Sequence, residues 1–184
     1  NAAISACEKA SQWPWALRLL ALMPTAGLDP NVVSYNAAIS ACEKAGHWRL
    51  ALALFVQMKR ERMEVDGVTY SVLLEALHGR SFALDVFREA LQGGYFPRLL
   101  SNGDFKLDLH ELSPAAGVLA TWWWLHEVLP RSLLTAETIP DRVEVITGWG
   151  RHREQWSTAD LKATVDRFLD LLGVLRAAPS NKGC

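Results

Sequence analysis

The sequence predicts an α-solenoid of helical hairpin repeats followed by a small α/β sandwich. The decapeptide NAAISACEKA fills positions 1–10 and returns letter for letter at 36–45, which is 35 positions later. That offset lies in the range of periods of helical repeat arrays. In the second half the order of elements is β-α-β-α, which is typical of an α/β sandwich with a parallel strand pair.

The similarity between the copies extends beyond the decapeptide. A third, degenerate copy begins with TYSVLLEAL at 69–77, and its second part, ALDVF at 83–87, aligns with ALALF at 51–55 only if three residues are deleted. We therefore assign residues 1–92 to the array. Because at least three units are usually needed to bury a continuous core, two and a half copies predict a truncated array. The other matching pairs are Trp13 and Trp48, Ala16 and Ala51, Leu17 and Leu52, Leu19 and Leu54, Met23 and Met58, Val33 and Val68, and Tyr35 and Tyr70.

Each copy is predicted to form two helices. In the complete copy the first helix spans about 33–45 and stops before Gly46, and the second spans about 48–61. In the first copy Pro14 falls in the first turn of the second helix, where its missing N–H does no harm. The residues expected to face the core are Tyr35, Ala38, Ile39 and Cys42 on the first helix, and Trp48, Ala51, Leu52, Phe55 and Met58 on the second.

Composition describes a folding chain without a strong overall charge. Among 184 residues, 50% are apolar and 21% charged, and the net charge of −1 argues against a strong non-specific nucleic-acid binder. Three cysteines without a CxxC or Cys/His cluster argue against a zinc site, so Cys7 and Cys42 are expected to be small buried hydrophobes. No stretch reaches the roughly 18 apolar residues of a membrane span. Because Asn1 falls in the middle of a repeat, we expect a fragment without its leader.

The segment VVSYNAAISACEKAGHWRLALALFVQM at 32–58 resembles the pentatricopeptide repeat (PPR), whose unit is 35 residues. The rival tetratricopeptide repeat has a period of about 34 and a Trp–Leu-Gly–Tyr signature that is absent here. The PPR resemblance covers residues 1 to about 92. It implies sequence-selective binding of single-stranded RNA, one base per repeat.

The resemblance assigns base reading to the Asn after the Tyr and to the last residue of the unit. Those residues are Asn36 with Asp66 and Asn1 with Asn31, while Ser71 holds the same place in the third copy without an assignable partner. In the family Asn with Asp favours uracil, and Asn with Asn favours a pyrimidine. The alternatives are that an Asn at a helix start is only a cap, and that the array binds a protein.

After residue 92 the expected elements change. GGYFPRLLSNG at 93–103 is rich in turn formers, so we place a linker at 93–104 and a second domain at 105–184. Three consecutive tryptophans, 122–124, sweep about 200° of their helix, so they cannot all face one core; core packing competes with base stacking for the others. The expected elements are a strand at 105–112, a helix at 113–130 with Ser113 as N-cap and Pro114 first, a strand VEVIT within 138–153, and a helix at 157–175.

Two short motifs lie in this second half. LDLH at 107–110 places Asp108 and His110 on the same side of a predicted strand, because side chains alternate along a strand. TGWG at 147–150 follows a strand and precedes a helix, and His152 comes two residues later. Glycines at such a turn let backbone N–H groups approach a phosphate.

Together, in this order and spacing, the motifs resemble the Smr (small MutS-related) domain, whose pattern is L-D-x-H-G and then T-G-x-G-x-H-S. The resemblance covers about 105–184 and implies an endonuclease acting on RNA or DNA. His110 would be the general base. Asp108 would orient it or hold a divalent metal, Mg²⁺ or Mn²⁺. His152 completes the catalytic set. The residues expected to bind phosphate are Thr147, Gly148, Trp149, Gly150 and Arg151.

The chain departs from that pattern in three ways. Glu111 replaces the usual Gly, Arg153 replaces the usual Ser, and the last strands of the domain are missing, which would leave an unpaired sheet edge. The sequence thus predicts an RNA-processing protein, monomeric and with no membrane partner, that couples PPR binding of single-stranded RNA to an Smr endonuclease. A non-catalytic RNA-binding adaptor and a protein-binding scaffold are the alternatives. An organellar location, chloroplast or mitochondrion, rests on the family alone.

Overall fold

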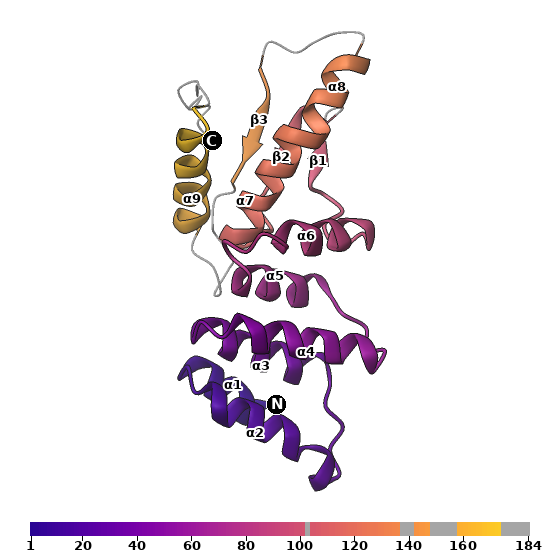
Figure 1. Cartoon of the computed structure of the whole chain (residues 1–184), viewed down its shortest axis with the longest axis vertical. Coiled ribbons are helices and arrows are strands. Elements are labelled where there is room, and N and C mark those ends of the chain that lie inside the picture. The colour runs from indigo at the N-terminus through magenta and orange to yellow at the C-terminus, as the bar shows by residue number, and fades with distance from the viewer. Residues whose placement is uncertain (102–103, 137–141, 148–157, 174–184) are drawn as a thin grey trace, which may run out of the picture.

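The computed structural model describes residues 1–101, 104–136, 142–147 and 158–173, and this part of the chain is mostly helical. Helices α1 to α6 form a stack, and the later elements lie at the end of the stack away from the N-terminus (Figure 1). Within these ranges, none of the helices combines the length and the apolar character that crossing a membrane requires.

The stack consists of three helical hairpins. Each first helix packs against its own second helix, and from the second hairpin onward it also packs against both helices of the preceding hairpin. This is the arrangement of a helical solenoid, as predicted. The helices are α1 (Ala2–Lys9) and α2 (Trp13–Leu22), α3 (Val32–Lys44) and α4 (Trp48–Arg60), and α5 (Gly67–Ala76) and α6 (Ala83–Gln92), with a short 3₁₀ turn η1 (Pro24–Ala26) after α2.

The turns between helices repeat with the sequence. Gly46 follows the end of α3 with φ +73°, and its N–H donates to the carbonyl of Glu43. Ser11, its counterpart in the first copy, has the same left-handed backbone with φ +53°. The turn after the second helix repeats in the same way, with Gly27 at +70° and Arg62 at +56°. The predicted helix stop at Gly46 is therefore confirmed.

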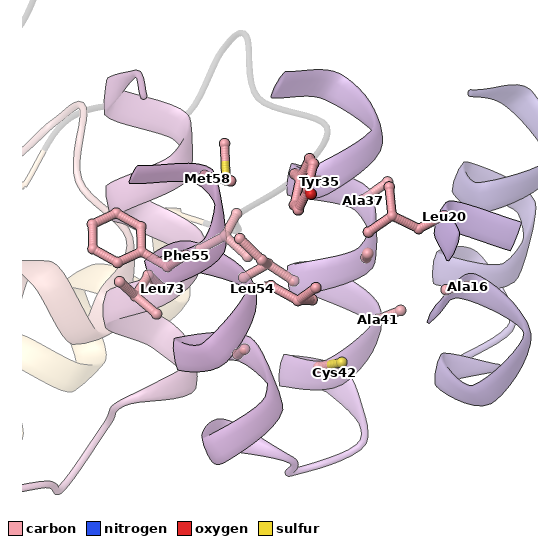
Figure 2. Packing of buried hydrophobic residues seen from close by; sticks show 14 of the residues in the cluster. Ala16, Leu20, Tyr35, Ala37, Ala41, Cys42, Leu54, Phe55, Met58 and Leu73 are labelled. Atoms are coloured by element: carbon pink, nitrogen blue, oxygen red, sulfur yellow. The ribbon is translucent and has the colours of Figure 1, made fainter. Parts of the chain in front are cut away.

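Small residues on α3 let neighbouring helices approach closely. Ala37 and Ala41 lie beside Ala16 and Leu20 of α2 (Figure 2), and all four are buried. Cys42, one residue further, has no exposed surface. Burial raises the pKa of its thiol to about 11, so it behaves as a small hydrophobe, as expected.

Cys7, which has the same local sequence as Cys42, is only half-buried. The two cysteines therefore differ in environment because of what packs on their helices, and the expectation of burial holds fully for Cys42 alone.

Among the described residues, the second half contains a small sheet and four helical segments. Strand order is β1-β2-β3, with β1 antiparallel to β2 and β2 parallel to β3. The expected parallel pair is thus present, but the strand predicted at 105–112 is much shorter, and β1 lies inside the segment predicted as a linker. The elements are β1 (Leu100–Ser101), β2 (Lys106–Asp108), α7 (Pro114–Trp123), the π-helical η2 (Trp124–Val128), α8 (Leu129–Thr135), β3 (Glu144–Ile146) and α9 (Thr158–Leu171).

The helix predicted to end at residue 130 continues to Thr135 because a π-helical segment accommodates its proline. Pro130 has no N–H to donate to the carbonyl of His126, and its ring would collide with that carbonyl in a regular α-helix. Widening the helix to the π form in η2 avoids the collision, so the helix continues instead of stopping.

The three consecutive tryptophans have three different environments. Trp124 is buried, and its indole N–H donates to a backbone carbonyl just before β2, 2.6 Å away. Trp123 meets Phe87 of α6 edge-on, with ring centroids 6.1 Å apart. Trp122 stacks on His126 at 4.3 Å. Core packing therefore accounts for Trp124, and Trp123 faces the array.

The hydrophobic core crosses from the third hairpin into the α/β part. Leu74 of α5 and Phe87 of α6 belong to the same buried cluster as Leu107 and Trp124, whereas Leu73 belongs to the cluster of the hairpins. The third hairpin is therefore packed on both sides.

Candidate nucleic-acid interface

Both predicted base-reading pairs are brought together by the fold. The side-chain amide of Asn1 donates to Oδ1 of Asn31 at 3.3 Å, and that of Asn36 donates to Oδ1 of Asp66 at 3.4 Å. The same contact thus recurs one hairpin later, each time between a first helix and the residue that begins the next first helix.

Asn31 and Asp66 are also helix N-caps. Oδ1 of Asn31 accepts the backbone N–H of Ser34 at 3.1 Å, and Oδ1 of Asp66 accepts that of Thr69 at 2.7 Å. In both capping boxes the N3 hydroxyl reaches back to the cap backbone. The capping alternative therefore holds for these two residues, but it is wrong for Asn36, which lies inside α3.

The amide of Asn36 can be oriented from its neighbours. Its Nδ2 donates to the Asp66 carboxylate, whereas its Oδ1 is buried and, among the residues that the structure describes, accepts no hydrogen bond. Flipping the amide would point an oxygen at the carboxylate, which is unfavourable. The pair therefore presents the exposed Asp66 carboxylate to solvent and keeps Asn36 as its donor.

Two lysines that the sequence reasoning missed lie on the same helices. Lys44 in the last turn of α3 pairs with Glu8 of α1 at 2.9 Å, and Ser40 donates to the same carboxylate at 2.9 Å. Lys9 is the counterpart of Lys44 in the first copy and is exposed. The sequence could have pointed to both lysines, because each occupies the same position in a copy of the repeated decapeptide.

The third hairpin lacks this arrangement. Glu75 stands at the place of Ser40, beside Glu43. Burial, and then the charge of Glu75, raises the pKa of the Glu43 carboxyl. The hydroxyl of Ser71, the third predicted reader, donates to the carbonyl of Gly67 in its own helix at 2.8 Å.

A second candidate site lies at the turn after β2. Oδ1 of Asp108 accepts the backbone N–H of His110 at 3.0 Å and lies 2.5 Å from its Nδ1. The prediction that both residues lie on one strand face is wrong, because the strand ends at Asp108. The Asp108 carboxylate accepts a hydrogen bond from the backbone N–H of His110, two residues further on, as in an Asx turn. The two side chains meet nevertheless, and Asp108 engages Nδ1 of His110 but not Nε2.

The surroundings of His110 mix charges of both signs. Its Nε2 lies 3.5 Å from the Glu111 carboxylate. A small pocket at the turn is lined by Asp108, His110 and Glu111 together with Arg98, Phe96, Leu99 and Leu112. Sequence reasoning missed Arg98; its only signal is a position next to Pro97 in the presumed linker.

The other predicted phosphate-binding motif is placed only at its first residue. Thr147 is half-buried directly after β3, and the N–H of Leu109 donates to the carbonyl of Ile146 at 2.8 Å, so Thr147 follows the strand beside the Asp108 turn. In the described ranges no three His, Cys, Asp or Glu side chains gather to hold a metal, and Asp108 is already engaged by His110. Outside the described residues lie Gly148, Trp149, Gly150, Arg151 and His152.

Comparison with known proteins bears on the helical stack. Residues 1–46 match the family described as Pentatricopeptide repeat domain, and residues 30–79 match the PPR repeat family. Pentatricopeptide repeat-containing protein At1g18900 of Arabidopsis thaliana is 30% identical over 106 residues, which is 54% of this chain and 12% of that protein. The family matches end at residue 79, so the Smr resemblance stays a prediction. Over residues 1–79 the helical stack of this chain is therefore similar to pentatricopeptide repeats, and the chain spans only a small part of that relative's length.

Proposed function

We propose that this chain binds single-stranded RNA and reads two neighbouring bases with the pairs Asn1–Asn31 and Asn36–Asp66. The observation that carries the proposal is the recurrence of one side-chain contact, 3.3 Å and 3.4 Å long, in consecutive hairpins that match the PPR families. Amide and carboxylate groups together offer the donors and acceptors that a base edge requires.

Two lysines could supply positive charge for the proposed RNA binding. Because the net charge is only −1, contacts with the RNA backbone depend on local cations. Lys9 and Lys44 are the last residues of α1 and α3; α1 follows its N-cap Asn1, and α3 contains Asn36. Replacing Lys44 by Ala should weaken binding to all sequences alike and reduce the salt slope by about 0.7. Lys59→Ala, on the second helix α4, is the matched control, because Lys59 also forms an ion pair, with Glu89.

The base-reading role is tested by Asp66→Asn. Asn is as good an N-cap as Asp, so the helix start is retained, and the second pair becomes identical to the first. We expect fluorescence anisotropy with short RNAs to show that the preference for uracil over cytosine at this base is lost while overall affinity is kept. An unchanged preference would show that Asp66 is a cap and nothing more.

A second candidate activity, phosphodiester cleavage, is favoured by the Asp108–His110 pair with Arg98 in the same pocket. In this reaction Nε2 of His110 takes the proton of an RNA 2′-hydroxyl. The 2′-oxygen attacks the adjacent phosphorus and the 5′-oxygen leaves, taking a proton from a general acid, for which His152 is the candidate. Arg98 stabilises the phosphate charge, which the Glu111 carboxylate opposes. The products are a 2′,3′-cyclic phosphate and a 5′-hydroxyl end.

Cleavage is tested on labelled single-stranded RNA and DNA, with and without EDTA, using His110→Ala and Asp108→Asn. His126→Ala is the control, because that histidine stacks on Trp122 and does not line the pocket at the turn. Cutting of RNA alone that the first two variants lose and the control keeps would support the mechanism. Binding without cutting would leave an RNA-binding adaptor, and absence of salt-sensitive binding would favour a protein-binding scaffold.

A further inference from the structure

Helix α7 continues the packing pattern of the hairpins, although it lies beyond the repeats. It packs against both helices of the third hairpin, α5 and α6. In the same way α3 packs against α1 and α2, and α5 packs against α3 and α4. Helix α7 therefore packs on the third hairpin as the first helix of a fourth hairpin would, although its axis is inclined steeply to those of α5 and α6 (Figure 1).

The residue that begins α7 repeats the local geometry of Asn31 and Asp66. Ser113 is the N-cap, and its hydroxyl accepts the backbone N–H of Ala116, three residues on, at 3.4 Å. It also contacts the preceding reader position, because its Oγ lies 3.5 Å from the carbonyl oxygen of Ser71. Ser113 thus contacts Ser71 as Asn31 and Asp66 contact Asn1 and Asn36, but through the backbone carbonyl of Ser71 and not its side chain.

The contact between Ser71 and Ser113 is partly buried, whereas the first two pairs each include a residue exposed to solvent. Asn31 and Asp66 are exposed, but Ser113 is only 1% exposed. The Ser71 hydroxyl donates within its own helix, and the Glu75 carboxylate accepts the backbone N–H of Ala115 at 3.0 Å. The polar groups at the third position are therefore used to dock α7.

We propose that α7 ends base reading: the chain discriminates bases at two adjacent positions, and the next nucleotide passes the Ser71–Ser113 contact without its base being read. This inference rests on the proposed RNA binding. The unread nucleotide would then lie next to the turn that carries His110, which precedes Ser113 by only three residues. The junction would act as a fixed spacer between the bases that are read and that turn.

The experiment measures discrimination at each position along a short single-stranded RNA. Every base is substituted in turn, and competition binding to the whole chain is measured. We expect two adjacent positions at which a wrong base costs about fivefold or more, equivalent to roughly 1 kcal/mol, and less than about twofold at the third.

Two reciprocal variants make the test specific to α7. Asn36→Ser should abolish discrimination at the second base, whereas Ser71→Asn, which installs the reader residue, should create none at the third. Discrimination at a third adjacent base, in the unchanged chain or in Ser71→Asn, would overturn this inference and leave the proposed function intact. Absence of discrimination at every base would overturn both. If Ser71→Asn does not fold, the profile of the unchanged chain decides.

Discussion

Equivalent positions that carry different residues allow the repeats to be compared with each other. Ser11 and Gly46 occupy the same turn of consecutive hairpins, both with a positive φ. Glycine adopts this conformation without a steric cost, whereas a residue with a Cβ pays on the order of 1 kcal/mol. In this turn the first hairpin therefore carries backbone strain that the second avoids, and the reverse holds in the turn after the second helix, where Arg62 is the counterpart of Gly27.

Exchanging the two residue types should change the free energy of unfolding in opposite directions. A Cβ at Gly46 would meet nothing within 4 Å, so Gly46→Ala should destabilise the protein by about 1 kcal/mol through the backbone alone. Ser11→Gly should stabilise it by a similar or smaller amount, since glycine also gains entropy in the unfolded chain. Urea unfolding measures both. Shifts of the same sign would show that contacts, and not φ, control these turns.

At the scale of elements, the two interfaces between first helices differ in charge. Between α1 and α3, Glu8 is held by Ser40 and Lys44. Between α3 and α5, Glu43 faces Glu75, and burial together with this like charge raises its pKa. The second interface thus holds an acid in a place that favours its protonated form.

Substitution of these acids should have opposite effects at neutral pH. Below the ordinary pKa of a glutamate, Glu43 is protonated in both folded and unfolded chains and costs nothing. As pH rises through its raised pKa, the folded protein must hold a desolvated anion beside Glu75. Glu43→Gln should therefore raise Tm at pH 7 and have little effect at pH 4 or below. Glu8→Gln, which removes an ion pair, should lower Tm at pH 7 by an amount worth less than about 1 kcal/mol.

The sequence predicts an element well when a repeating pattern of neighbouring residues determines it. The helices of the second hairpin were predicted to within one residue, because the apolar stripe of a helix is a strong periodic signal. Strand β2 was predicted too long, since the alternation F-K-L-D-L-H continues past Asp108. The side chain that ends the strand acts through a hydrogen bond to His110, which no alternation shows. The continuation beyond Pro130 was missed because a π-helical segment has no simple pattern.

At the scale of the whole molecule, some parts of the candidate site could be predicted from sequence patterns, whereas others depend on the complete fold. The pairs Asn1–Asn31 and Asn36–Asp66 could be predicted over 30 residues, since the PPR resemblance names these two positions of each unit. The role of Ser113 could not be predicted, because no repeat extends past the third hairpin and the packing of α7 on α5 depends on the complete fold. Arg98 was missed for the same reason.

Adjacent leucines on α5 test whether the hairpins and the α/β part unfold together. Leu73 and Leu74 are both fully buried, but Leu73 packs in the cluster of the hairpins and Leu74 in the cluster of the sheet and α7. Because one helix joins the two clusters, we expect one cooperative unit. Leu73→Ala and Leu74→Ala should each destabilise it by about 2–5 kcal/mol.

Hydrogen exchange distinguishes one unit from two. If the chain unfolds as one unit, both variants lower the protection of α3 and of α7 amides by the same free energy. If it unfolds as two units, Leu73→Ala lowers protection in α3 only and Leu74→Ala in α7 only. The first result would mean that the position of the Asp108 turn relative to the pairs Asn1–Asn31 and Asn36–Asp66 is fixed by the common core. The second would mean that this position varies, so that under the proposed function the spacing between the bases and the turn would be set only when RNA binds.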